Sequence, residues 1–186
     1  MHRLFVALRP PAAIRDALLA LTSGVAGARW QDDEQLHVTL RFIGEADRHV
    51  AEDIDSALAA LACTMPPLAL AGVGRFDTRG RTTTLWAGVV PAEPLAHLHR
   101  KIDAALVRAG LPPERRAFTP HITLARLNAP EEATASWLRD HGSLRSKPFA
   151  IDSFLLFESH LGRAGARYEA IARYPLRPPC GSVSRA

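Results

Sequence analysis

The sequence predicts a fold of alternating strands and helices, built from two similar halves that face each other across a cleft. The first observation is a repeated tetrapeptide, His37-Val38-Thr39-Leu40 and His121-Ile122-Thr123-Leu124, whose copies lie nearly half a chain length apart. The second is that each copy follows a strand and a helix and precedes a helix and a strand. Duplicated halves that pack about a two-fold axis would bring the two tetrapeptides together.

Each element of the first half has a local reason. A short apolar run predicts a buried strand, and Pro10-Pro11 ends it and begins a helix. Helical spacing of apolar residues predicts the helices, and β-forming residues in alternation predict the strands. In order, the predicted elements are a strand at 4–8, a helix ending near 22, a strand at 36–43, a helix at 50–61 and a strand at 68–76.

The second half repeats that order after a turn at 77–81. Pro130-Glu131-Glu132 begins a helix with acidic residues in its first turn, where the helix dipole favours them. The predicted elements are a strand at 82–90, a helix at 95–107, a strand that carries the second tetrapeptide and ends at 127, a helix at 130–138, a strand at 149–157, a turn at 159–166 and a strand at 167–176. We expect a single domain at 1–177, with halves at about 1–77 and 78–177, and a disordered tail at 178–186.

Length and composition limit the class of protein. A chain of 186 residues suits one domain or two small lobes that share a core. A net charge of +4 and a pI near 9.7 suit a polyanionic partner, although many proteins without one are as basic. Cys63 and Cys180 form no metal-ligand pattern and are expected to be reduced thiols. No stretch is long enough for a signal peptide or a membrane span, so we expect a soluble cytoplasmic protein with no membrane contact.

The tetrapeptides carry the predicted chemistry. Side chains alternate between the faces of a strand, so each copy presents its histidine and threonine on one face and its aliphatic residues on the other. Histidine titrates near neutral pH, so a pair can supply one general acid and one general base. Two hydroxyls and a protonated imidazole around one point suit the oxygens of a phosphoryl group. The residues therefore predict displacement at phosphorus without a metal.

A zinc site is the main competing interpretation of the histidines. Such a site needs three or four close protein ligands, and neither tetrapeptide has a second ligand at a spacing that points the same way. His97 and His99 are two apart on a predicted helix, where residues at that spacing do not share a face. A single His-x-Thr also occurs by chance on polar strand faces, and only its repetition within matching flanks argues for a site.

Other polar and aromatic residues receive plainer interpretations. We expect the remaining histidines to lie at the surface: His2, His49, His97, His99, His141 and His160. Trp86 and Trp137 fit strand and helix patterns and are expected in the core, not as platforms for nucleic-acid bases. Arg115 and Arg116 precede the second tetrapeptide and are either a solvated loop or a contact to substrate phosphate; the sequence leaves both open.

The paired tetrapeptides resemble the hallmark of the 2H phosphoesterase superfamily. Their flanks are similar to its RNA 2′,3′-cyclic phosphodiesterase branch, also called 2′-5′ RNA ligases. The likeness spans about residues 3 to 176. It is carried by Arg3-Leu4-Phe5-Val6-Ala7-Leu8, Leu36-His37-Val38-Thr39-Leu40-Arg41-Phe42-Ile43-Gly44-Glu45, Leu85-Trp86-Ala87-Gly88-Val89, Pro120-His121-Ile122-Thr123-Leu124-Ala125-Arg126, and Ser159 with Gly165-Ala166-Arg167-Tyr168.

This resemblance implies an α+β fold of two pseudo-symmetric lobes, with antiparallel sheets lining a central cleft and helices outside. It implies hydrolysis of a 2′,3′-cyclic phosphate on RNA or a nucleotide to a 2′-phosphate, with no metal or other cofactor. It also implies some capacity for the reverse joining reaction through a 2′-5′ linkage. We expect the chain to act as a monomer with no obligate protein partner.

Family positions assign roles residue by residue. His37 matches the proton donor to the leaving 3′-oxygen, and His121 matches the base that activates water. Thr39 and Thr123 match the phosphate-binding hydroxyls. Arg126 matches an arginine often found after the second motif. Simple alternation puts it on the opposite face from His121, so its role requires a bulge or the strand end.

The sequence departs from the family at one position and leaves some choices open. Members often carry an arginine three residues before the tryptophan that matches Trp86; this chain has Thr83 there, with Arg79 and Arg81 displaced. By chemistry alone the two histidines are interchangeable, and only family position separates donor from acceptor. The same residues also fit an RNA-end binding or joining protein with incidental hydrolysis, or a phosphodiesterase of small cyclic nucleotides.

Overall fold

A single mixed sheet forms the centre of the protein, shown by a computed structural model that describes residues 1–162 and 165–179. Apart from β4 and β9, neighbouring strands run antiparallel. Across the sheet the strands are β4 (Cys63–Thr64), β9 (Gly165–Arg177), β8 (Ser153–Gly162), β1 (His2–Leu8), β3 (Val38–Ala46), β7 (His121–Pro130), β6 (Arg81–Val90) and β5 (Ala69–Thr78), and β2 (Arg29–Trp30) pairs with β7. This confirms the predicted α+β class with antiparallel pairing.

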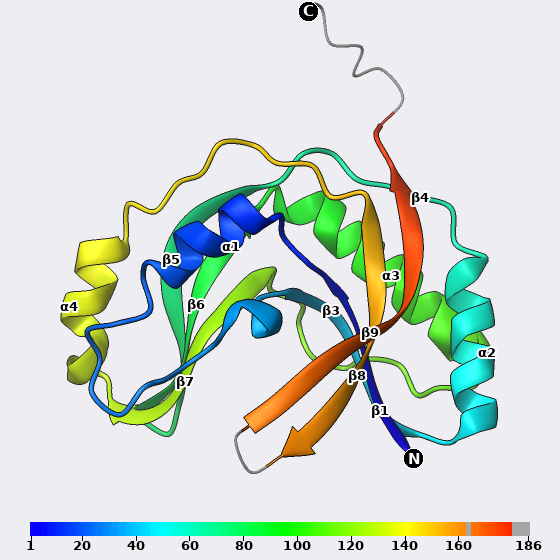
Figure 1. Ribbon diagram of the computed structural model, residues 1–186, viewed down its shortest axis with the longest axis horizontal. Helices are drawn as coiled ribbons and strands as arrows, with labels where there is room; N and C mark the ends of the chain where they lie inside the picture. Colours follow the sequence, from blue (N-terminus) through cyan, green and yellow to red (C-terminus); the bar gives the residue numbers. More distant parts are fainter. Residues whose placement is uncertain (163–164, 180–186) are drawn as a thin grey trace, which may run out of the picture.

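Four α-helices of the described residues pack outside the sheet (Figure 1). They are α1 (Ala12–Leu19), α2 (Arg48–Ala59), α3 (Ala92–Arg108) and α4 (Glu132–His141), with a short 3-10 helix, η1 (Asp33–Gln35). The apolar stripe predicted for α3 is its buried face, which packs against β3 and α2, whereas α4 packs against β5 and β7. None of the helices in the described part of the chain has the length and apolar character that a membrane crossing requires.

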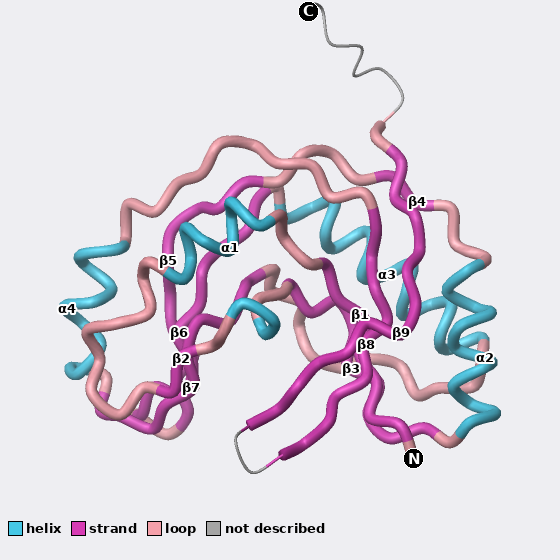
Figure 2. Tube along the Cα trace, viewed as in Figure 1, coloured by secondary structure: helices cyan, strands magenta, loops and turns pink. Residues whose placement is uncertain are grey.

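The two motif strands lie side by side at the middle of the sheet. They pair antiparallel at Val38 and Ile122 and diverge on either side of that point. The sheet is therefore bent into two wings (Figure 2): a first wing of β1, β3, β8 and β9, and a second wing of β5, β6 and β7. Although β5 ends the first half of the sequence, it lies in the second wing, and β8 of the second half lies in the first wing beside β1.

Several element boundaries differ from those predicted. The turn expected at 159–166 is wrong, because β8 continues to Gly162 and β9 begins at Gly165. The strand expected from 149 begins at Ser153, and Phe149 makes only an isolated bridge to Leu68. Two strands can pair through their backbones without an apolar pattern, so the residues at the end of β8 and the start of β9 did not indicate strands in the sequence. Most of the predicted tail, residues 180–186, lies outside the described residues.

Both motif strands bulge at the last residue of their tetrapeptide. Val6 and Ala7 pair with Arg41 and Thr39, which leaves Leu40 extra on β3. In the same way, Leu85 and Trp86 pair with Ala125 and Thr123, and this leaves Leu124 extra on β7. An extra residue reverses the alternation of side chains beyond it. The residue five positions after each motif histidine therefore returns to the histidine's face of the strand.

The first bulge also buries an arginine. Arg41 is only 7% exposed, and its Nε donates to Asp103 Oδ1 at 2.8 Å. Its Nη2 donates to the Pro112 carbonyl at 2.5 Å, and Glu114 lies 3.5 Å from its Nη1. The guanidinium thus links β3 to α3 and to the loop that leads into the second motif.

Substitution of Arg41 by methionine should destabilise the protein. Without the guanidinium, the negative charge of Asp103 has lost its partner. Removing one member of a buried ion pair lowers the free energy of unfolding by roughly 3 kcal/mol or more. Arg48→Met is the matched control: its side chain is 84% exposed and pairs with Glu52 on the helix surface, where such pairs contribute about 0.5 kcal/mol. Free energies of unfolding in urea that fell by the same small amount in both variants would contradict a stabilising role for the buried guanidinium.

Candidate active site

The two motif histidines are held by the same hydrogen bond. Nδ1 of His37 lies 2.7 Å from the Gln35 carbonyl oxygen, and Nδ1 of His121 lies 2.6 Å from that of Thr119. A carbonyl oxygen only accepts, so Nδ1 carries the hydrogen in both rings. Nε2 of each neutral histidine is then free for proton transfer, and both rings are fixed by the residue two positions earlier.

Aromatic side chains pack around both imidazoles. The ring centroid of His37 lies 5.0 Å from that of Phe5 and 5.3 Å from that of Tyr168. His121 lies 4.9 Å from Phe76 and 6.1 Å from Trp86. These contacts restrict the rings and remove water from one side of each.

Trp86 is not a fully buried core residue, contrary to the prediction. It is only partly buried and forms a wall beside His121, whereas Trp137, 3% exposed, is a core residue as predicted. The indole of Trp86 covers Gly74 on the neighbouring strand so closely that an added Cβ would lie 2.3 Å from the ring. Only glycine at position 74 leaves room for this wall.

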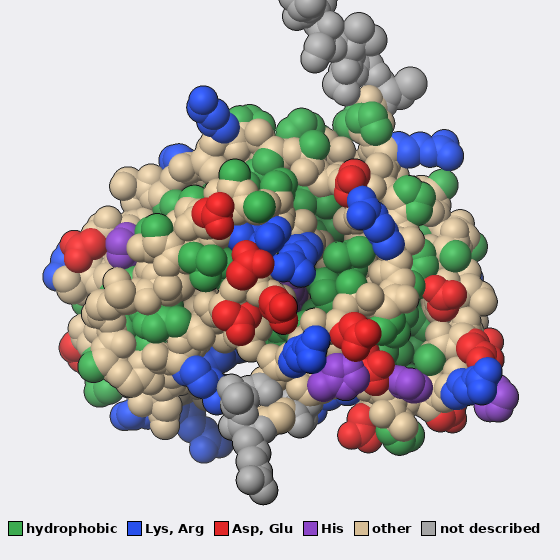
Figure 3. Space-filling view, in the orientation of Figure 1, with side chains coloured by type: hydrophobic (Ala, Val, Ile, Leu, Met, Phe, Trp, Pro, Cys, Tyr) green, Lys and Arg blue, Asp and Glu red, His purple; other side chains and the backbone are tan. Residues whose placement is uncertain are grey.

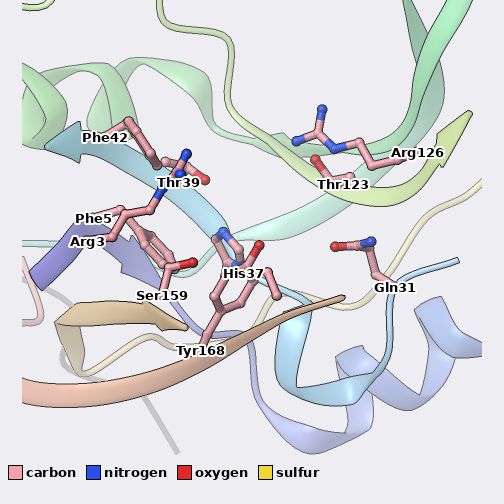
Figure 4. Close-up of a pocket in the computed structure, with 11 residues that line it drawn as sticks. Arg3, Phe5, Gln31, His37, Thr39, Phe42, Thr123, Arg126, Ser159 and Tyr168 are labelled. Carbon is pink, nitrogen blue, oxygen red and sulfur yellow. The ribbon is translucent and has the colours of Figure 1, made fainter. Parts of the chain in front are cut away.

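His37, Thr39 and Thr123 of the predicted face line a pocket between the two wings (Figure 4). Eleven residues line it: Arg3, Phe5, Gln31, His37, Thr39, Phe42, Thr123, Arg126, Ser159, Ala166 and Tyr168. Continued by one residue each way, the pairing of Val38 with Ile122 sets His37 opposite Thr123 and Thr39 opposite His121. Both threonine hydroxyls can therefore donate to an anion held between the histidines.

His121 is reached from a second opening. That opening is lined by His121 and Thr39 together with Phe42, His99, Arg116 and Phe118. Of these two spaces, His37 lines the first and His121 lines the second. Thr39 and Phe42 line both spaces, so the two openings adjoin at these residues.

Arg126 reaches the pocket because of the bulge at Leu124. It lies on the face of Thr123, as Figure 4 shows, and its Nη1 donates to the Thr84 hydroxyl at 2.9 Å. The equivalent residue after the first motif is Phe42, 45% exposed, which also lines the pocket. Arg3 lies 5.4 Å from the Phe42 ring centre in a cation–π contact.

The other basic residues singled out in the sequence divide into two groups. Arg116 lines the second opening, whereas the guanidinium of Arg81 bonds to Asn128 at the outer end of the β5–β6 hairpin. Arg79 lies in the turn of that hairpin with φ of 52°. Neither Arg79 nor Arg81 is among the described residues that line the pocket, so they do not replace an arginine at position 83.

His99 was wrongly predicted to be a surface residue. Its ring stacks on Phe118 at 4.5 Å, and its Nδ1 lies 2.6 Å from the Leu40 carbonyl oxygen at the bulge. No sequence pattern indicated this contact, because Leu40 and His99 are joined only by tertiary packing. Phe5, Gln31 and Tyr168 were likewise not singled out as pocket residues, although Phe5 and Tyr168 lay in family-like segments.

Electrostatics favour the neutral form of both histidines. The pKa of His37 is lowered to about 4, chiefly by burial among aromatic rings; the hydrogen bond to Gln35 opposes this shift, and the charges of His121 and Arg126 contribute to it. Burial also lowers the pKa of His121, with Arg126 acting in the same direction. An anion between the imidazoles would oppose both effects.

Within residues 1–162 and 165–179, no three His, Cys, Asp or Glu side chains come together as a set that could hold a metal ion. The donors that meet in the pocket are imidazole, hydroxyl, amide and guanidinium groups. Such groups suit an anionic ligand, since most of them donate hydrogen bonds and the guanidinium is always charged.

Comparison with known proteins identifies the relatives of this arrangement. Residues 10–163 match the family model of the 2′-5′ RNA ligase superfamily. An Aeropyrum pernix protein named RNA 2′,3′-cyclic phosphodiesterase is 33% identical over 143 residues, which cover 75% of this chain and 81% of that protein. An Archaeoglobus fulgidus protein of the same name is 28% identical over 170 residues, 90% of this chain and 96% of that protein.

Solved structures show the same fold. A Thermus thermophilus protein superposes with a TM-score of 0.74 at 28% identity and covers 95% of this chain and 99% of that one. The Escherichia coli protein LigT, crystallised with 3′-AMP, superposes with a TM-score of 0.75 at 26% identity and covers 94% of this chain and 98% of that one.

The lowered pKa of His37 predicts a pH-dependent stability. The folded pKa of about 4 lies below the ordinary value of 6.5, so between these values the unfolded state binds the proton more readily and the free energy of unfolding rises with pH. His37→Gln should show a shallower rise than the wild type when urea unfolding is measured from pH 4 to 7.5. Parallel curves for the two proteins would show that His37 keeps its ordinary pKa when folded.

Proposed function

Because the chain belongs to the 2′-5′ RNA ligase superfamily, we propose that it hydrolyses the 2′,3′-cyclic phosphate of RNA or a nucleotide to a 2′-phosphate. The observation that carries this proposal is the strand pairing that sets each motif histidine opposite the threonine of the other motif, with His37, Thr39 and Thr123 lining one pocket and His121 lining the adjoining opening. Each imidazole has its Nδ1 bonded to a carbonyl, which leaves Nε2 for the reaction.

In the proposed mechanism, His121 takes a proton from water as the water oxygen bonds to phosphorus. The bond between phosphorus and the 3′-oxygen breaks, and protonated His37 gives its proton to that oxygen. The hydroxyls of Thr39 and Thr123 donate to the non-bridging oxygens as negative charge builds on them, and Arg126 adds positive charge nearby. All proton transfers are assigned to side chains, so the mechanism needs no metal.

The shape of the pocket supports this division of roles. In an in-line displacement, the attacking and leaving oxygens are on opposite sides of phosphorus. The first pocket, which His37 lines, has the aromatic rings of Phe5, Phe42 and Tyr168 to receive a nucleoside. The leaving 3′-oxygen would then face His37, and water would enter by the opening at His121.

The second opening supports a further capacity for the reverse reaction. Arg116 lies there beside His121, where a second RNA strand with a free 5′-hydroxyl could take the place of water. A joining or end-binding protein with incidental hydrolysis therefore remains the competing function. Comparison of turnover with the joining rate on the same cyclic-ended oligonucleotide distinguishes the two.

Replacement of either motif histidine by alanine should remove most of the hydrolytic activity, since a general acid or base commonly contributes roughly 10²–10⁴-fold. The assay uses a 2′,3′-cyclic-phosphate-ended oligonucleotide in excess chelator, with the position of the product phosphate determined. His97→Ala, an exposed histidine on α3, is the control and should retain full activity.

A 2′-phosphate product from the wild type in chelator, and none from His37→Ala or His121→Ala, is the expected result. Loss of wild-type activity on chelation with recovery on adding zinc would overturn the mechanism. Tight binding of the cyclic end with negligible turnover would favour the end-binding alternative.

The pKa shifts predict different pH profiles for kcat/KM and kcat. The free enzyme needs one protonated and one neutral histidine, and both pKa values are lowered, so kcat/KM should be greatest below pH 6.5. The bound anion stabilises the protonated imidazole, so the kcat profile should lie at higher pH. Arg126→Gln should move the kcat/KM maximum upwards, since its charge lowers both pKa values. Coincident profiles that peak above pH 7 would contradict these assignments.

A further inference from the structure

A second recess adjoins the pocket on the side of β2. Its volume of about 210 Å³ is no smaller than the 180 Å³ of the pocket itself. The residues that line it are Arg29, Trp30, Gln31, Asp32, Gln35, Arg126, Ala166 and Tyr168. Gln31, Arg126, Ala166 and Tyr168 line both spaces. A ligand that fills the pocket can therefore extend into the recess without leaving the protein surface.

Two arginines lie opposite each other in this recess. Arg29 of β2 pairs with Arg126 of β7, and directly opposed residues of antiparallel strands project on the same face. Like charges in that position destabilise a sheet. Neither arginine has an ion pair with a described residue, whereas the nearby Arg9 and Arg15 both pair with Asp33. The uncompensated pair indicates a site for an anion.

The neighbouring groups favour the same interpretation. Gln31 is fixed through its backbone, whose N–H donates to the Leu124 carbonyl at 2.8 Å, and its amide faces the space beside His37 (Figure 4). Among the described residues that line the recess, Asp32 is the one carboxylate. Its Oδ1 accepts from the backbone N–H of Gln35 at 3.0 Å, where it caps η1. Two positive charges thus face one negative charge that is already hydrogen-bonded.

The anion site is close to the proposed cyclic-phosphate site. Arg126 lies three residues beyond Thr123 on β7, at most roughly 10 Å along an extended strand, and the length of one nucleotide can bridge that distance. Basic and acidic side chains both border the hollow between the wings (Figure 3). A nucleic acid strand that leaves the pocket through the recess would pass beside Arg126 and Arg29.

We infer that this recess binds the phosphodiester group that precedes the terminal nucleotide, and that Arg29 makes the enzyme prefer RNA oligonucleotides to mononucleotides. This inference rests on the proposed function and narrows its substrate. A mononucleotide 2′,3′-cyclic phosphate has no phosphate group to place there. Arg29 contacts no reacting atom, so its effect is on substrate choice.

The test compares three substrates: adenosine 2′,3′-cyclic phosphate, the adenosine dinucleotide ending in a cyclic phosphate, and that dinucleotide with an uncharged methylphosphonate linkage. The wild type should prefer the charged dinucleotide. Arg29→Gln should lower the ratio of kcat/KM for this dinucleotide to that for the mononucleotide roughly tenfold, as for one lost charge-assisted contact. The slope of log kcat/KM against log salt on the dinucleotide should fall by about 0.7.

Two further variants make the test specific. Arg29→Lys keeps the charge and should restore part of the preference. Arg48→Gln removes an exposed arginine of α2 and should leave the ratio unchanged. The inference is overturned if Arg29→Gln affects all three substrates equally, or if the methylphosphonate dinucleotide suffers the same loss as the charged one.

Equilibrium binding separates this inference from the proposed function. Dissociation constants of adenosine 2′-phosphate and of the dinucleotide 2′-phosphate need no turnover. If the wild type hydrolyses none of the substrates, the proposed function fails, yet tighter binding of the dinucleotide that Arg29→Gln abolishes would still support the recess. Equal affinity of the wild type for both ligands would exclude it.

Discussion

The hydrogen bond from each motif histidine to the carbonyl two residues before it is the constraint on which the site depends. Both rings have the same tautomer because the partner can only accept. A strand alone would place the imidazoles on the correct face, but it would not choose which nitrogen meets the ligand. The hydrogen bond also fixes which edge of each imidazole points away from the carbonyl, and the aromatic side chains packed around the ring keep it in that orientation.

Symmetry of the backbone is accompanied by asymmetry of the environment. Both motif strands carry the bulge at the same position, yet the residue that each bulge turns towards the ligand is Phe42 in one case and Arg126 in the other. His37 is enclosed by more protein than His121, although both bond in the same way. The two histidines therefore have different surroundings, although their backbone positions and hydrogen bonds match.

Much of this arrangement could be predicted from the sequence, and the rest depends on contacts that leave no periodic pattern. The repeated tetrapeptides and the apolar spacing predicted the motif strands, the helices and the face shared by His37, Thr39, His121 and Thr123. Arg126 reaches the pocket only because β7 bulges at Leu124. The sequence of one strand does not reveal such a bulge, because register depends on how two strands pair. The contacts of His99 could not be predicted either, because Leu40 and Phe118 are far from it in sequence and meet it only through tertiary packing.

The placement of β8 beside β1 has a consequence for the order in which the protein is made. A ribosome releases β1 well before β8, the strand that covers its free edge, because β8 follows about 150 residues later in the sequence. Until then β1 and β3 have an unpaired edge, which is a template for pairing with other chains. Contacts so distant in sequence also slow folding. β5 and β6 can pair early through their short hairpin, whereas the wing that holds His37 is completed only after β8 and β9 have been made.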